Sequence, residues 1–277
     1  MRKAYIGKDD IVRFSIWEII LAVFLTVFVI MPIGVMLVGS ILPKEVTSLD
    51  RGIIEVILSF SIENYIEIFR QMSVFNTILN SIVVTVVSMF ITCLVSFFIA
   101  EKIIGLNEKY IKVILACLGL FVLFPFALFL GIFNPIWESI GLVNTHLGVV
   151  LFYVVVSMPF CIFVYVKYLA RIPKNILEAA MVDGLDGYRL YKLKFAYLKS
   201  AKAITMLFCF IVSWNDVLGV RFLNRLEKDF TINQEILRII SLESIDKVHV
   251  WAFFTIVTAV IILFLILLNN YLLQDNV

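Results

Sequence analysis

Six long apolar stretches recur along the chain, and they limit its possible folds more than any other feature. A helix needs about 20 mainly apolar residues to cross the hydrocarbon core of a bilayer. Hydrophobic residues make up 62% of the 277 residues and charged residues only 16%, which is more apolar surface than one soluble core of this size can cover. The sequence therefore predicts an all-α integral membrane protein with six transmembrane helices. The expected spans cover residues 17–42, 77–104, 110–133, 147–170, 203–223 and 248–273.

The basic residues predict how these spans are oriented. Lys and Arg near the ends of spans favour the cytoplasmic side of the membrane. With a cytoplasmic N-terminus, 15 of the 23 Lys and Arg residues fall on that side, so both termini are expected to be cytoplasmic. Residues 1–75 would then hold an N-terminal cytoplasmic segment, the first span and an extracellular loop. Residues 76–273 would hold a core of five helices with a cytoplasmic loop at 171–202.

Several functions are excluded by what the sequence lacks. It contains no G-x-x-x-x-G-K-[ST] phosphate-binding loop and no H-E-x-x-H metal motif. The chain itself is therefore not expected to hydrolyse ATP, to be an enzyme, or to bind a cofactor or metal. A net charge of +2 gives no reason to expect nucleic-acid binding. The cysteines and histidines stand singly and predict buried thiols and structural histidines. They are Cys93, Cys117, Cys161, Cys209, His146 and His249.

The cytoplasmic loop at 171–202 has the pattern of a helix, a turn and a second helix. Pro173 can open a helix because its missing N–H would be unpaired there, and helix-favouring residues follow as far as Val182. Gly184 permits a sharp turn, and a second amphipathic stretch begins near Tyr188. The residues alone leave two interpretations open. The loop is either a rigid element that inserts into a cytoplasmic partner or an amphipathic linker that rests on lipid headgroups.

The fifth apolar stretch carries a polar cluster, Trp214-Asn215-Asp216. A carboxylate inside a membrane span costs roughly 2.5–3.5 kcal/mol and normally faces the bundle interior or water. Asn215 and Asp216 therefore lie either on a polar translocation path or, if the span ends early, at the outer interface. A polar stripe at helical spacing heads the second apolar stretch and predicts hydrogen bonds between helices. It comprises Asn80, Ser81, Thr85 and Ser88.

With these motifs in place, the sequence resembles a known family. Glu178-Ala179-Ala180 followed by Asp183-Gly184 is similar to the E-A-A-x-x-D-G coupling loop of binding-protein-dependent ABC importer permeases. Further segments resemble the carbohydrate branch of that family, in particular the six-span subunit of maltose-type sugar importers. They are Asn80-Ser81, Gly141-Leu142-Val143-Asn144-Thr145, Pro159-Phe160 with Phe163, Ile172-Pro173 and Trp214-Asn215-Asp216.

The resemblance implies the type I ABC importer permease fold, with a function to match. The chain would be one permease subunit of an ATP-driven importer that moves a carbohydrate across the bacterial cytoplasmic membrane by alternating access. The coupling-loop residues would contact the ATPase, and Asn80, Trp214, Asn215 and Asp216 would lie on the translocation path. The implied partners are a second permease subunit, two ATP-binding cassette subunits that carry ATP and magnesium, an extracellular solute-binding protein and membrane lipid.

Two alternatives remain beside this interpretation. The chain could be a secondary transporter or channel driven by an ion gradient, or an ABC permease for a non-sugar solute. Ion-driven transporters often contain internal repeats and broken helices around charges at the membrane midplane. This sequence has no clear repeat, and Asp216 is its candidate charge.

The chain also departs from the pattern of the family that it resembles, at Tyr197 and Ala201, where prolines are usual.

Overall fold

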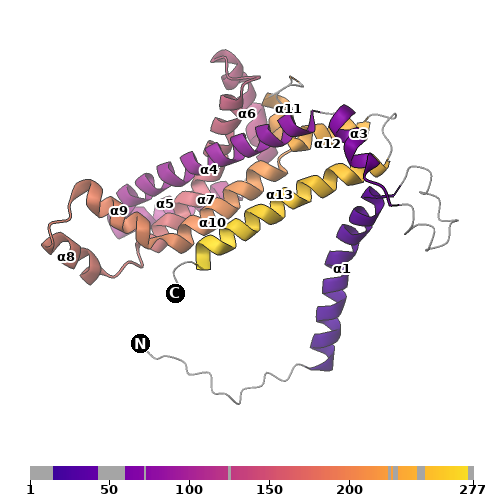
Figure 1. The fold of residues 1–277 in the computed structure, drawn as a ribbon. Coiled ribbons are helices and arrows are strands. Elements are labelled where there is room, and N and C mark those ends of the chain that lie inside the picture. Colours follow the sequence, from indigo (N-terminus) through magenta and orange to yellow (C-terminus); the bar gives the residue numbers. More distant parts are fainter. Residues whose placement is uncertain are drawn as a thin grey trace. The chain divides into compact units, whose positions relative to one another are not determined.

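The computed structural model describes residues 15–42, 60–71, 73–123, 126–223, 226, 230–241 and 247–273. Within these residues all regular secondary structure is helical, which confirms the predicted all-α class (Figure 1). The chain forms two compact units. One comprises Met1–Ile68 and Asp246–Ile256, and the other comprises Phe69–Ile245 and Val257–Val277.

The first unit contains α1 (Ile16–Ser40), most of α3 (Glu63–Gln71) and the beginning of α13 (Lys247–Leu273). α1 corresponds to the first predicted span, and its apolar side chains are exposed on every side over most of its length, as suits a helix surrounded by lipid. The last carbonyls of a helix have no partner within it. Here Asn64 of α3 pairs two of them, at the end of α1 and just after it: its Nδ2 donates to Ser40 O at 2.9 Å and to Leu42 O at 2.7 Å. These bonds fix the end of α1 to α3.

Three helices run side by side through the second unit: α4 (Val74–Ile104), α7 (His146–Leu169) and α10 (Lys199–Asn215) (Figure 1). α7 is the central one, because it packs on α4, on α10 and on α5 (Glu108–Val122). The later part of α13 joins this bundle through Phe264, whose ring stacks on that of Phe210 with the centroids 3.8 Å apart.

The two ends of this bundle carry different structures (Figure 1). α8 (Lys174–Val182) and α9 (Gly187–Tyr197) lie at the end where α4 and α7 finish. α6 (Phe126–Ser139), α11 (Leu218–Leu223) and α12 (Ile232–Ser241) lie at the opposite end, where α4 and α7 begin. The helix, turn and helix predicted within residues 171–202 are therefore present, as α8 and α9.

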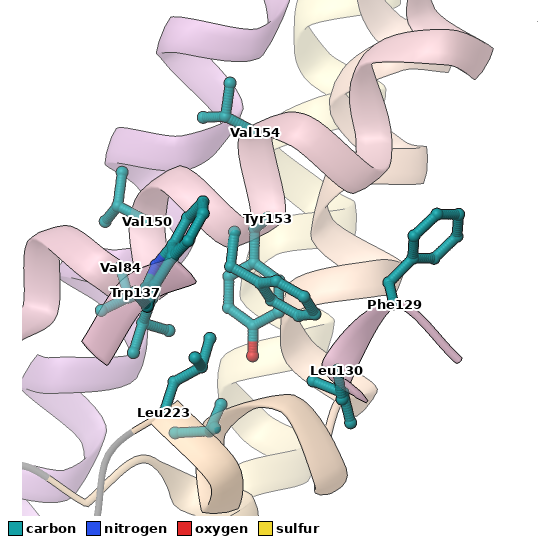
Figure 2. Packing of buried hydrophobic residues seen from close by; sticks show 11 residues of the cluster. Val84, Phe129, Leu130, Trp137, Val150, Tyr153, Val154 and Leu223 are labelled. Atoms are coloured by element: carbon teal, nitrogen blue, oxygen red, sulfur yellow. The ribbon is translucent and has the colours of Figure 1, made fainter. Parts of the chain in front are cut away.

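Each end of the bundle has its own packed core. Figure 2 shows Tyr153 of α7 in the middle of one cluster, with Val84 and Trp137 to one side in this view and Phe129 and Leu130 to the other. This cluster packs α6 and α11 against α4 and α7. The second cluster lies towards α9, and its buried side chains include Phe97, Ile103, Tyr165, Leu169 and Leu198.

Half of the twelve buried residues of α4 are Ser or Thr, with small hydroxyl side chains. Small side chains at an interface let two helices approach closely, which fits the extensive packing of α4 on α7. The predicted hydrogen bonds between helices are present in part: Ser213 Oγ of α10 donates to Thr85 Oγ1 at 3.1 Å, whereas Ser88 Oγ donates to Thr85 O within α4. The buried hydroxyl residues are Thr77, Ser81, Thr85, Ser88, Thr92 and Ser96.

The predicted count of six spans is not confirmed by the described residues. Four helices there are long and apolar enough to cross a membrane: Ile16–Ser40, Val74–Ile104, His146–Leu169 and Ala252–Leu272. α9 and α10 make a fifth if the pair, bent by 73°, is counted as one span. The expected span at 110–133 is divided, because α5 ends at Val122 and α6 begins at Phe126. Pro125, in the segment between them, lies outside the described residues.

Most of the cysteines and histidines have the structural roles predicted for them. Cys93, Cys161 and Cys209 are buried. The prediction of a buried thiol is wrong for Cys117, which is exposed because α5 has no fully buried side chain among its described residues. His249 Nε2 lies 3.0 Å from Glu67 Oε2. Across the described part of the chain, no group of His, Cys, Asp and Glu could hold a metal ion.

Candidate functional site

The fifth predicted span is interrupted at Asp216, one of the predicted path residues. α10 ends at Asn215, Asp216 is extended (φ −75°, ψ 119°), and α11 begins at Leu218. The carboxylate turns back onto the new helix: Oδ1 accepts from Gly219 N at 2.8 Å, and Oδ2 accepts from Val220 N at 3.2 Å. A carboxylate at this position caps the first turn of a helix. The expectation of one continuous helix over 203–223 is therefore wrong.

A further donor reaches the Asp216 carboxylate from α7. Tyr153 Oη donates to Asp216 Oδ2 at 2.9 Å, and both side chains are buried. A buried carboxylate needs such donors, because an unpaired buried charge is costly. Gly219 makes room for it: a Cβ there would lie 2.3 Å from Asp216 Oδ2 and 2.6 Å from Phe152 Cε1. Sequence reasoning missed Tyr153 and Gly219, although an Asp inside an apolar stretch is a helix N-cap residue and points to a break.

The peptide groups at this break are bound by Asn233, near the start of α12. Asn233 Nδ2 donates to Trp214 O and, at 3.2 Å, to Asp216 O. The last carbonyls of a helix have no partner within the helix itself. One side chain distant in the sequence therefore supplies the partners that the interrupted span lacks. Asn233 was also missed, since nothing in its local sequence distinguishes it.

The same segment is bound to the start of α4. Asn80 Nδ2 donates to Phe230 O at 3.2 Å, and Ile232 N donates to Ser81 Oγ at 2.8 Å. Residues 230–234, which we call the latch, thus connect α4 to the end of α10. The predicted polar residues at the head of the second span take part in these contacts.

The structure brings three of the four predicted path residues to one end of the second unit. Asn80, Trp214 and Asp216 are linked through the latch. Asn215 is not part of this arrangement: its side chain is exposed, and its Nδ2 donates to Ile211 O in its own helix at 2.9 Å. Trp214 is buried with its ring stacked on that of Phe210, the centroids 5.0 Å apart.

At the opposite end, α8, residues 183–186 and α9 form a helical elbow. Gly184 has a φ of 79°, a conformation that favours glycine. Gly184 N donates to Met181 O at 3.1 Å, and Leu185 N donates to Ala180 O at 2.9 Å. These two bonds make a Schellman motif, which ends a helix by pairing its last carbonyls. A Schellman motif needs its left-handed residue four positions after the residue whose carbonyl accepts the longer bond. Gly184 stands in that position relative to Ala180, at the end of α8.

The residues of the E-A-A-x-x-D-G motif in the elbow differ in solvent exposure. Glu178, Ala179, Asp183 and Gly184 are exposed, whereas Ala180 is buried. Large apolar side chains are also exposed here, among them Val182 at 87% and Tyr188 at 78%. An exposed apolar patch beside charged groups is typical of a surface that binds a partner protein.

An ion pair holds the elbow to the bundle. Lys194 Nζ of α9 contacts Glu101 Oε1 of α4, and both side chains are largely buried. The bend between α9 and α10 falls at Leu198 (φ −90°, ψ 35°), directly after Tyr197. The chain therefore turns here with Tyr197 and Ala201 at the two positions where the sequence resemblance would predict prolines.

We expect Lys194→Ala to destabilise the elbow by about 1–2 kcal/mol, because it leaves the Glu101 carboxylate partly buried without its cation. Limited proteolysis between residues 183 and 202 should become faster than in the wild type. The charge-swapped pair Glu101→Lys with Lys194→Glu should restore part of the protection. Equal cleavage rates in the wild type and in Lys194→Ala would contradict a stabilising role for the pair.

These features define a class of protein, a multi-pass helical membrane protein with a broken span and an elbow beyond the end of its bundle. No family model matches the chain. In sequence, the inner membrane ABC transporter permease protein YcjP of Escherichia coli is 27% identical over 216 residues, which cover 76% of this chain and 76% of that protein.

The names of two further relatives also refer to sugars. The alpha-glucoside transport system permease protein AglG of Rhizobium meliloti is 25% identical over 224 residues, covering 78% of this chain and 58% of that protein. The multiple sugar-binding transport system permease protein MsmG of Streptococcus mutans is 31% identical over 153 residues, covering 53% and 54%. The chain thus spans little more than half the length of these two relatives.

The fold leads to the same class. A crystal structure of a bacterial ABC transporter involved in the import of the acidic polysaccharide alginate contains a chain that matches with a TM-score of 0.75. The match covers 94% of this chain and 99% of that one, at 18% identity. The resemblance to ABC importer permeases is therefore confirmed, in sequence by the relatives and in fold by the alginate importer.

Proposed function

We propose that the chain is one permease subunit of an ATP-driven ABC importer that moves a carbohydrate across the bacterial cytoplasmic membrane. The observation that carries this proposal is the elbow, which presents the E-A-A-x-x-D-G residues at one end of the bundle. Relatives named as alpha-glucoside, multiple-sugar and melibiose/raffinose/stachyose permeases support a carbohydrate as the solute. An ion-driven transporter or channel is not favoured, because the relatives are ABC permeases.

In this proposal the chain crosses the membrane six times, with both termini and the elbow in the cytoplasm. Its partners are a second permease subunit, two ATP-binding cassette subunits that bind ATP and magnesium, and an extracellular solute-binding protein. The latch and the predicted path residues Asn80, Trp214, Asn215 and Asp216 then lie towards the outer side. The excess of basic residues on the elbow side supports this orientation.

The elbow suits the transmission of movement from an ATPase. Its two short helices are fixed to each other by the glycine turn and to α4 by the Lys194–Glu101 pair. A rigid element of this kind moves as one body when its partner closes on ATP. It then biases the bundle between an inward-facing and an outward-facing state, which is what alternating access requires.

The experiment is reconstitution of the complete complex in proteoliposomes, with ATP-dependent uptake of sugar as the readout. We expect Glu178→Lys with Gly184→Leu to abolish binding of the ATPase dimer to the purified permease pair and to reduce uptake to background. The first change reverses an exposed charge, and the second places a side chain where φ is 79°.

The matched control is Glu108→Lys, which reverses another exposed carboxylate, on α5 and outside the elbow. It should leave ATPase binding and uptake close to the wild-type values. ATP hydrolysis that stays coupled to transport in the double elbow variant would refute the proposed role of the elbow. Uptake by this chain alone, without ATP, would refute the proposed function itself.

A further inference from the structure

A small, partly open cavity lies under the latch, in the second unit. Its polar lining comes from three helices and the latch: Ser81 and Thr85 of α4, Tyr153 of α7, Ser213 and Trp214 of α10, and Thr231 and Asn233 of the latch. The space open to the centre of a water molecule is about 10 Å³, roughly what one water needs. We call this cavity the Trp214 pocket. The described residues that line it include no charged side chain.

Two of the lining groups have no hydrogen-bond partner among the described residues. Trp214 Nε1 and Thr231 Oγ1 are both buried and unpaired, with the parent residues 6% and 8% exposed. The indole N–H is a donor only, whereas the threonine hydroxyl both donates and accepts. Buried polar groups in native proteins are nearly always paired, with protein or with ordered water. A cavity of this size beside two unpaired groups indicates a bound oxygen.

Stacking on one face holds the Trp214 ring in place. One face of the ring stacks on Phe210, whose ring stacks on Phe264 in turn. Ser213 Oγ is already paired with Thr85 Oγ1, and Tyr153 Oη with Asp216. The two lining groups without a partner among the described residues are therefore one donor and one hydroxyl. With no charged side chain beside them among the described lining residues, they suit a neutral O–H group better than an ion or a carboxylate.

The latch covers the pocket, and hydrogen bonds that can exchange with water hold it there. Hydrogen bonds join the latch to the neighbouring helices: Asn233 donates to Trp214 O and to Asp216 O, Asn80 donates to Phe230 O, and Ile232 N donates to Ser81 Oγ. Hydrogen bonds exchanged with water contribute only modestly to stability. Withdrawal of residues 230–234 would expose Trp214 Nε1, and Thr231 would move with the segment that covers it.

We propose that the Trp214 pocket is a binding site for one hydroxyl oxygen. A water molecule occupies it while the latch is closed, and a hydroxyl group of the transported solute takes its place when the latch opens. The second half rests on the proposed function, because it requires a hydroxylated solute. The first half stands on the cavity and its two unpaired groups alone.

The water is tested by a density map of the purified complete complex at a resolution that shows other buried waters. We expect one density peak hydrogen-bonded to Trp214 Nε1 and Thr231 Oγ1, and its loss in Thr231→Val. An empty pocket in the wild type would overturn the proposal, whatever the complex transports. Because this readout needs no sugar, its failure is distinguishable from failure of the proposed function.

The solute site is tested by uptake of maltose and melibiose into proteoliposomes, and of the monodeoxy analogues of whichever sugar the wild type takes up. Trp214→Phe and Thr231→Val should each slow uptake of the parent sugar about three- to tenfold, the effect of one lost hydrogen bond. One deoxy analogue should be slow in the wild type, and neither variant should slow it further.

Two variants separate binding from folding in this experiment. Thr231→Ser keeps the hydroxyl and should restore the preference for the parent sugar. Thr92→Val removes another buried, unpaired hydroxyl of α4 that does not line the pocket, and it should not change the ratio of parent to deoxy uptake. Equal slowing of parent and all deoxy sugars in Thr231→Val would overturn the solute site.

Discussion

Gly148→Ala is expected to destabilise the protein by about 3 kcal/mol or more, the range of severe overpacking. Gly148 lies in the first turn of α7, where a Cβ would lie 2.1 Å from Leu142 O and 3.1 Å from Trp137 Cδ1. The nearer atom belongs to the backbone, so it cannot rotate away as a side chain does. Either α7 or the turn before it must move.

That movement would break the N-cap bond of α7 and the bond that joins α6 to α7. Gly148 N donates to Thr145 Oγ1 at 3.0 Å, and Gly148 O accepts from Trp137 Nε1 at 2.8 Å. The turn is itself bound to α11, because Asn144 N donates to Leu223 O at 2.7 Å. One methyl group therefore disturbs three helices at once.

The measurement is thermal unfolding of the purified protein in detergent, followed by helical circular dichroism. Gly119→Ala on α5 is the matched control, since nothing lies within 4 Å of the added Cβ. The control should stay within about 0.5 kcal/mol of the wild type, or gain slightly from the higher helix propensity of alanine. If Gly148→Ala unfolds at the temperature of Gly119→Ala, the close packing around Gly148 is refuted.

The second large effect is expected at Asp216. Replacement by alanine should cost about 3 kcal/mol, because it removes a helix cap and leaves three buried donors without their acceptor. These donors are Gly219 N, Val220 N and Tyr153 Oη. Tyr153→Phe removes only the last of them and should cost about 1 kcal/mol.

A double-mutant cycle separates the cap from the tyrosine bond. If the bond from Tyr153 to Asp216 is direct, the two substitutions together should cost less than the sum of their separate effects. The neighbouring Asn215→Ala is the control, because that side chain is exposed and bonded only within α10. Strictly additive effects of Asp216→Ala and Tyr153→Phe would count against the bond.

The elbow shows which part of the candidate site was predictable from sequence. Pro173 precedes the first residue of α8, Gly184 supplies the turn, and the second helix begins at Gly187, close to the expected start near Tyr188. These signals act between residues a few positions apart. Local backbone preference was therefore enough to predict the helix, the turn and the second helix.

Asp216 shows what local sequence signals could not predict. The free-energy cost of a carboxylate inside an apolar stretch predicted a functional or structural role for Asp216. Two of the residues that bind this part of the chain, however, lie far away in the sequence. Tyr153 is 63 residues earlier, and Asn233 reaches the carbonyls of Trp214 and Asp216 from beyond α11. Hydropathy averages over a window and extends a span across any single polar residue. It therefore predicted a continuous helix where capping interrupts one.

The sequence alone determined that this chain is a bundle of apolar helices with an elbow in its longest basic loop, because hydropathy, helix caps and turn residues act locally. Only the tertiary structure decided where the helices break and which polar groups meet. The Tyr153–Asp216 bond, the latch on α4 and α10 and the pocket beneath it join residues far apart in the chain. A polar group buried among apolar helices is stable only where a partner reaches it, and the fold determines which partners do.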